Sequence, residues 1–330
     1  MQEPASSLIA DSQGLICAFQ LAPLARLERE TLQGLEPSGA VWLHFNLTDR
    51  RAREWLSEEA HLPDAAVEAL LDDDPHVHVQ MLADGFVAVL RDLHHEREGD
   101  EAGFGTFVVY VDPKRMISGR WHALHTLDQL RRELGKGADQ PSPSPLALFE
   151  HLLECLAETF SAVVSKLFDR VEAAEDSILA GRYRDQGTEL RKVRWLLSRL
   201  RREARADRSA LARLPAQLPH ACGAEAARSL AAVIERFGGV SQDLELVEER
   251  ARLMQEEIAG RLGEATNRTL YMLSIVTAAL LPITLITGVF GMNVGGLPWL
   301  EHPHGFAHVM LLMSVMVLIA LALIRHGRVF

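Results

Sequence analysis

The chain has 330 residues, 48% of them hydrophobic, and a formal net charge of −11 at pH 7. The acidic balance argues against nucleic-acid binding, because phosphate contacts need a basic face. Its three cysteines are far apart and show neither a CxxC nor a Cys/His ligand spacing, which argues against a disulfide framework and a zinc finger. The start, Met1–Pro4, is not followed by an apolar run, so we expect a cytosolic N-terminal part.

The first part of the chain alternates strand-like and helical segments, and we predict an α/β domain over residues 1–145. Asp84-Gly85 lies between two apolar runs and indicates a hairpin. The predicted strands are Leu15–Leu21, Val41–Leu47, His76–Leu82, Phe86–Leu93, Phe104–Val111 and Met116–Trp121. The predicted helices are Arg51–Glu59, Asp64–Leu71 and Thr126–Leu134.

After a linker at Gly135–Pro145, apolar residues recur at helical spacing, and we predict a helical stalk over residues 146–269. Two helices are expected at Leu146–Ala180 and Glu189–Leu214, and Pro215–Gly223 breaks the pattern. A further helix starts near Ala224 and continues into an apolar segment. At ~1.5 Å per residue it would be on the order of 100 Å long.

Two apolar runs close the sequence, and each has about the ~20 residues that cross a bilayer as a helix. We predict transmembrane helices at 270–290 and 306–324, joined by an external loop at 291–305. A buried soluble helix is the alternative for one run, but two adjacent runs favour the membrane. Arg268, Arg325 and Arg328 flank the spans and the loop has no Lys or Arg, which places both termini in the cytoplasm.

A two-helix hairpin cannot enclose a pore, so conduction would need several copies around an axis. One stripe of the first span carries small and polar groups suited either to close helix contact or to a narrow wet pore. Its members are Asn267, Leu270, Ser274, Thr277, Leu281, Thr284 and Gly288.

The first span ends in Phe290-Gly291-Met292-Asn293, directly before the short loop. This placement, with the cytosolic α/β part and the two C-terminal spans, resembles the CorA family of divalent cation transporters over the whole chain. The resemblance implies a homopentamer in which Gly291, Met292 and Asn293 form the outer entrance and selectivity element. It also implies that Asn267, Thr284 and Gly288 line a pore.

The loop sequence Val294-Gly295-Gly296-Leu297-Pro298 resembles the zinc-transporting branch of that family, which implies proton-linked zinc movement. Glu301, His302 and His304, with His308 nearby, form a weak candidate metal site. Imidazole suits zinc better than magnesium, which prefers oxygen ligands. Solvated loop histidines without a ligand are the alternative.

Further polar groups are weaker candidates for cation binding in the cytosolic part. They are Asp72-Asp73-Asp74, His94-His95-Glu96, the pairs His76/His78 and His122/His125, and the helix acids Glu245, Glu248, Glu249, Glu256 and Glu257. A solvated turn, loop, packing site or helix surface is the ordinary reading of each.

The predicted fold class is therefore an α+β membrane protein: an N-terminal cytosolic α/β domain, a long helical stalk and two C-terminal transmembrane helices, assembled as a pentameric funnel. We expect a zinc transporter of a bacterial inner membrane, with no enzyme activity and no permanently bound cofactor. Its partners would be the lipid bilayer, divalent cations and possible co-transported protons. A magnesium, cobalt or nickel channel, or a membrane-anchored sensor or interaction protein, remain as alternatives.

Overall fold

A computed structural model of the protein describes residues 14–22, 24–27, 39–94, 103–136, 143–182, 185–218, 223–292, 294–299 and 302–326. The chain divides into two compact units, Met1–Met254 and Gln255–Phe330. The first unit contains a sheet and a helical bundle, and the second contains two long apolar helical segments.

The sheet of the first unit has seven strands in the order β2-β1-β3-β7-β6-β5-β4. All pairs are antiparallel except β3 with β7. The strands are β1 (Leu15–Leu21), β2 (Leu24–Arg26), β3 (Val41–Asn46), β4 (His78–Met81), β5 (Phe86–Leu93), β6 (Phe104–Val111) and β7 (Arg115–Arg120). The six predicted strands are confirmed within two residues at each end, whereas β2 is an additional strand.

The hairpin predicted at Asp84-Gly85 joins β4 to β5, with the N–H of Leu82 donating to the Gly85 carbonyl at 2.8 Å. Glycine is required at residue 85, because a Cβ there would lie 2.1 Å from the Val111 carbonyl oxygen. The turn therefore lies directly against the end of β6.

Helices cover both faces of the sheet, which explains its almost continuously apolar strands. On one face, α1 (Arg50–Glu58) and α2 (Asp64–Leu71) bury residues such as Leu56 and Leu70 against Val89 and Ile117. On the other face lie α3 (His125–Lys136) and α4 (Pro145–Leu179), where Phe149 meets Phe86 edge-on at 5.0 Å.

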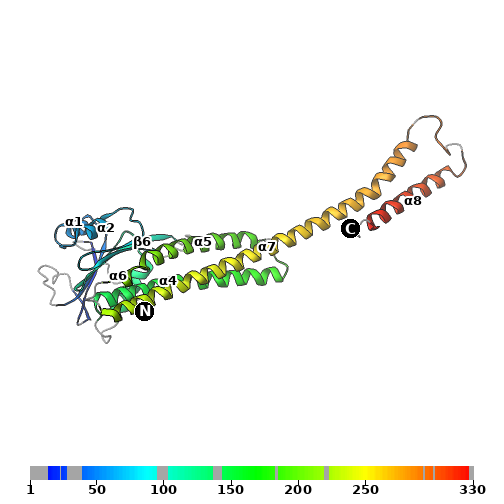
Figure 1. The fold of residues 1–330 in the computed structure, drawn as a ribbon. Coiled ribbons are helices and arrows are strands. Elements are labelled where there is room, and N and C mark those ends of the chain that lie inside the picture. Colours follow the sequence, from blue (N-terminus) through cyan, green and yellow to red (C-terminus); the bar gives the residue numbers. More distant parts are fainter. Residues whose placement is uncertain are drawn as a thin grey trace, which may run out of the picture. The chain divides into compact units, whose positions relative to one another are not determined.

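A helical bundle continues from α4 through α5 (Gln186–Leu211), the short α6 (Leu214–Gln217) and the first part of α7 (Gly223–Phe290) (Figure 1). The side chain of Ser144 caps α4 by accepting from the Ala147 N–H at 3.1 Å, and Pro145 occupies its first turn. The break expected at Pro215–Gly223 separates α5 from α7, and Pro215 itself lies in the four-residue α6. The Gly238-Gly239 pair is accommodated inside α7.

A buried acid connects the sheet to α3. Asp92 of β5 accepts hydrogen bonds from the Leu93 N–H and from both the N–H and the hydroxyl of Thr126. Burial raises the pKa of Asp92 to about 6, although these hydrogen bonds favour its ionised form. The carboxyl group is therefore held by α3 while its ionisation is penalised.

The second unit contains the C-terminal part of α7, with Pro282 inside the helix, and α8 (Gly305–His326). Two helical segments are long and apolar enough to cross a membrane, Ala224–Phe290 and Gly305–Leu323. A helix accordingly covers each of the two predicted spans.

Candidate functional site

The end of α7 and most of α8 expose large apolar side chains. Burying one such side chain stabilises a protein by ~1.5–3 kcal/mol, so a surface of this kind requires lipid or a partner helix. The exposed residues include Leu270, Met272, Leu273, Leu280, Leu281, Leu285, Phe306, Leu311, Leu318 and Leu323.

The seven stripe positions predicted on α7 are all exposed, from Asn267 to Gly288. The less exposed face of this segment carries Ile275, Pro282 and Ile286. At ~100° per residue, the two faces are separated by roughly 130° around the helix axis. Within the described chain, the stripe is thus left open to lipid, water or other copies.

The hydroxyl groups on this stripe are oriented by the helix itself. Ser274, Thr277 and Thr284 each donate to the carbonyl four residues earlier, at 2.9 Å. Their donor capacity is therefore used within the helix, while the oxygen lone pairs remain available as acceptors. A row of acceptors is compatible with the water shell of a passing cation.

The helix ends tightly at the predicted entrance motif. The Gly291 N–H donates to the Thr287 carbonyl at 2.8 Å, and the Met292 N–H to the Val289 carbonyl at 3.4 Å. A Cβ at residue 291 would lie 2.9 Å from the Thr287 oxygen, so this turn has no room for a side chain. Met292 is half exposed, and Asn293 lies outside the described residues.

Three histidines gather where the loop enters α8. The ring of His302 lies 6.1 Å from that of His304 and 5.3 Å from that of His308. Trp299, which has a positive φ, stacks on His308 with ring centroids 5.5 Å apart. A Cβ at residue 305 would lie 2.3 Å from the Trp299 carbonyl oxygen, so Gly305 has no room for a side chain. Glu301, the acidic member of the predicted loop site, lies outside the described residues.

Two histidine pairs expected in the first unit are arranged differently from the prediction. β4 starts at His78, whose Nδ1 contacts the carbonyl of His76 at 2.8 Å, so the two rings do not share a strand face. His122 precedes α3 and instead lies beside His94, with ring centroids 5.2 Å apart. His95 and Glu96 lie outside the described residues.

The acidic candidates of the first unit are held in local contacts. Asp72 caps α2 and accepts from the Asp74 N–H at 3.0 Å, while Asp73 pairs with Arg53 at 3.3 Å.

On α7, Glu245 and Glu248 pair with Arg201 of α5 at 2.8 and 3.0 Å, and Glu245 also pairs with Arg205 at 2.7 Å. Glu249 pairs with Arg252, one turn further along α7, at 2.7 Å. These three acids of α7 therefore form ion pairs within the chain.

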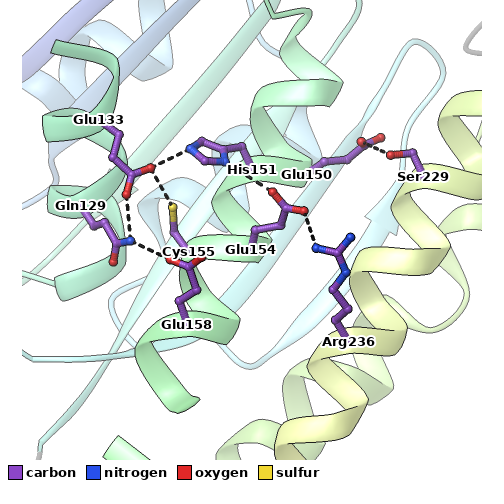
Figure 2. Close-up of polar contacts among 9 residues, drawn as sticks. All are labelled: Gln129, Glu133, Glu150, His151, Glu154, Cys155, Glu158, Ser229 and Arg236. Atoms are coloured by element: carbon purple, nitrogen blue, oxygen red, sulfur yellow. Dashed lines mark hydrogen bonds and ion pairs between the residues drawn. The ribbon is translucent and has the colours of Figure 1, made fainter. Parts of the chain in front are cut away.

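A further polar cluster lies between α3 and α4 and was missed by the sequence interpretation (Figure 2). Among the described residues, Glu133, His151 and Cys155 form the one group of three whose ligand atoms all lie within 4.8 Å of one another. The spacing of His151 and Cys155, one helical turn apart, is a Cys/His ligand spacing after all, contrary to the expectation from sequence.

The model of the family described as CorA-like Mg2+ transporter protein matches residues 37–326. The chain is 26% identical over 287 residues to the zinc transport protein ZntB of Yersinia enterocolitica, covering 87% of each. It is 27% identical over 303 residues to the divalent cation transporter CmaX of Pseudomonas aeruginosa, covering 90% of this chain and 91% of CmaX.

Solved structures show the same fold over nearly the full length. The full-length CmaX protein superposes with a TM-score of 0.80 at 26% identity, covering 97% of this chain and 99% of CmaX. The CorA magnesium transporter of Methanocaldococcus jannaschii superposes with a TM-score of 0.79 at 19% identity, covering 94% and 96%. The latter comparison supports the fold alone.

Proposed function

The chain belongs to the CorA family of divalent cation transporters, and on that basis we propose that it moves zinc ions across a bacterial inner membrane together with protons. Both termini would lie in the cytoplasm, since Arg268 precedes the first span and the loop between the spans contains no Lys or Arg. Zinc would be the transported substrate of this path.

The gathering of His302, His304 and His308 is the observation that carries the choice of zinc over magnesium. Imidazole nitrogen is a favourable ligand for zinc, whereas magnesium demands oxygen ligands and retains its water. Imidazole can also bind and release a proton, which supplies a group for proton coupling. The relative named a zinc transport protein supports the same choice.

The path would run through a homo-oligomer, since two spans per chain cannot enclose a pore, and the family resemblance implies five copies. Gly291, Met292 and Asn293 would form its outer mouth, with the carbonyl oxygens of five Asn293 side chains facing the water shell of the ion. Below the mouth, the ion would pass the hydroxyl acceptors of Thr284 and Thr277.

Zinc flux into proteoliposomes tests this proposal, using wild type and Asn293→Ala with Val294→Ala as the matched control. Val294 is an exposed neighbour of the motif without a polar group. We expect flux to be lost in Asn293→Ala, kept in Val294→Ala, resistant to excess magnesium, and faster with an imposed pH gradient.

Each part of the proposal fails on a separate result. Strong competition by magnesium would assign the magnesium branch of the family instead of zinc. Equal zinc flux in Asn293→Ala and Val294→Ala would show that the ion does not depend on the Asn293 side chain. A zinc flux that ignores the pH gradient would remove the coupling to protons.

A further inference from the structure

Three side chains of different chemistry converge between α3 and α4 (Figure 2). His151 Nε2 lies 2.8 Å from Glu133 Oε2, and the Cys155 thiol donates to the same oxygen at 3.6 Å. Two donor groups from one face of α4 therefore point at a single carboxylate oxygen of α3. An oxygen approached by two groups that can both lose a proton is a setting in which a metal ion can replace those protons.

The carboxylate is held in this orientation by Gln129, one turn earlier on α3. The Gln129 amide donates to Glu133 Oε1 at 2.9 Å and to Glu158 of α4 at 3.0 Å. This clamp occupies one oxygen of Glu133 and leaves the other facing His151 and Cys155. Burial opposes ionisation of Glu133, but the hydrogen bonds from Gln129 and His151 outweigh it and lower the pKa of Glu133, so the group carries a negative charge.

We propose that Glu133, His151 and Cys155 bind a zinc ion or a similar thiophilic divalent cation, at a site separate from the transport path. Ligand atoms around a tetrahedral zinc ion are roughly 3.3–3.8 Å apart, given zinc–ligand distances of ~2.0–2.3 Å. The sulfur–oxygen distance of 3.6 Å already falls in this range. The remaining separations, which are at most 4.8 Å, need only side-chain adjustment.

A second carboxylate stands behind the imidazole, where histidine ligands of metals usually have a carboxylate, a backbone carbonyl or a water molecule. His151 Nδ1 lies 3.5 Å from Glu154 Oε2, and Glu154 is itself held by Arg236 of α7 at 3.1 Å (Figure 2). Once a metal takes the place of the proton on Nε2, Glu154 can accept a hydrogen bond from the imidazole proton on Nδ1. It also connects the site to α7.

The site is open on one side and closed on the other. The side chains of His151 and Glu133 are 41% and 40% exposed, whereas Cys155 is 1% exposed. A hydrated ion can therefore meet the imidazole and carboxylate first and reach the sulfur last. Water or Glu158 is available to complete four-coordination.

The thiol selects the class of metal. Burial, and after it the charge of Glu133, raises the pKa of Cys155, so the group is a thiol when no metal is bound. Binding releases the thiol proton to solvent as the sulfur–metal bond forms. The metal also takes the place of the imidazole proton on Nε2, and the neutral ring then carries its proton on Nδ1, beside Glu154. Zinc and cobalt form such thiolate bonds, but magnesium, which requires oxygen ligands, does not.

Cobalt(II) titration of the full-length protein in detergent tests the site, because a cobalt–thiolate bond gives a charge-transfer absorption band in the near ultraviolet. We expect the band to saturate at one cobalt ion per chain, to disappear on adding zinc, and to persist in excess magnesium. Cys155→Ala should abolish the band, and Cys17→Ala should keep it. Cys17 is the matched control because it is another buried free cysteine.

Wild type alone can overturn the proposal, even if Cys155→Ala fails to fold. Absence of a thiolate band in wild type would mean that the cluster is a hydrogen-bonded contact and not a metal site. A band that survives in folded Cys155→Ala would equally overturn the assignment. Retention of the band in Asn293→Ala separates this site from the proposed transport path, so that either proposal can fail alone.

Discussion

Replacing Gly291 with alanine should reduce zinc flux about fivefold. The added Cβ would lie 2.9 Å from the Thr287 carbonyl oxygen, whereas ordinary contacts of a Cβ begin at 3.4 Å. The last turn of α7 must therefore open by about 0.5 Å to restore van der Waals contact. The same carbonyl accepts the N–H of residue 291 at 2.8 Å, and the shift stretches this hydrogen bond.

Weakening one hydrogen bond costs about 1 kcal/mol, which corresponds to about a fivefold change in a population. If only the unshifted turn presents the mouth correctly, the conducting fraction and the zinc flux fall by that factor. Zinc entry into proteoliposomes, normalised to the amount of correctly inserted protein, measures the effect.

Gly295→Ala is the matched control, because no heavy atom lies within 4 Å of a Cβ at residue 295. The two variants add the same methyl group to the same loop region, and only Gly291→Ala meets a backbone oxygen. Equal flux in the two variants would refute the steric reasoning. Wild-type flux in Gly291→Ala would show that the tight turn is not needed for conduction.

Three further predictions concern the first unit. Asp92, with its pKa raised to about 6, stabilises the fold below pH 3.8 and loses this contribution as pH rises through about 6. Melting curves at several pH values give the free energy of unfolding of wild type and of Asp92→Asn. The wild-type value should fall relative to that of the variant by up to ~3 kcal/mol between acid and neutral pH. A difference that does not change with pH would contradict this. Phe160→Ala, at a fully buried position, should cost ~3–5 kcal/mol in the free energy of unfolding, and a loss below ~1 kcal/mol would contradict close packing there. Glu245→Gln removes partly exposed pairs to Arg201 and Arg205, so the free energy of unfolding should fall by at most ~1 kcal/mol, and by less at high salt. A larger loss in the melting curves would show that these pairs are screened less than their exposure indicates.

Strands and helices that carry a strong local pattern could be predicted from the sequence. The run Phe86–Leu93 is apolar and bounded by Asp84-Gly85, and the structure places β5 at the same residues. Asp64–Leu71 likewise forms α2 with the predicted bounds. β2 could not be found in this way, because three residues, mostly exposed, show no alternation of apolar and polar side chains.

The His76/His78 pair shows where a local pattern was extended too far. Alternation along a strand predicts that residues two apart share a face, but β4 pairs with β5 only from His78, which lies opposite Val89. Among the described strands β4 lies at the edge of the sheet, so no second strand there continues its ladder to His76. Cross-strand pairing, and not the sequence of β4, decides where the strand begins.

The two candidate sites differ in how much of each is local. The α7 stripe lies on one helix, so the helical period alone brings its seven positions to one face. The Glu133 cluster needs α3 to pack against α4. The helical period predicts that His151 and Cys155 are neighbours on α4. It does not predict that Glu133, 18 residues before His151, turns one oxygen toward both. Gln129 sets that orientation from α3, and Arg236 of α7 holds the carboxylate behind His151. A ligand pair one turn apart on a helix therefore becomes a candidate metal site only when tertiary packing supplies the third ligand and the groups that orient it.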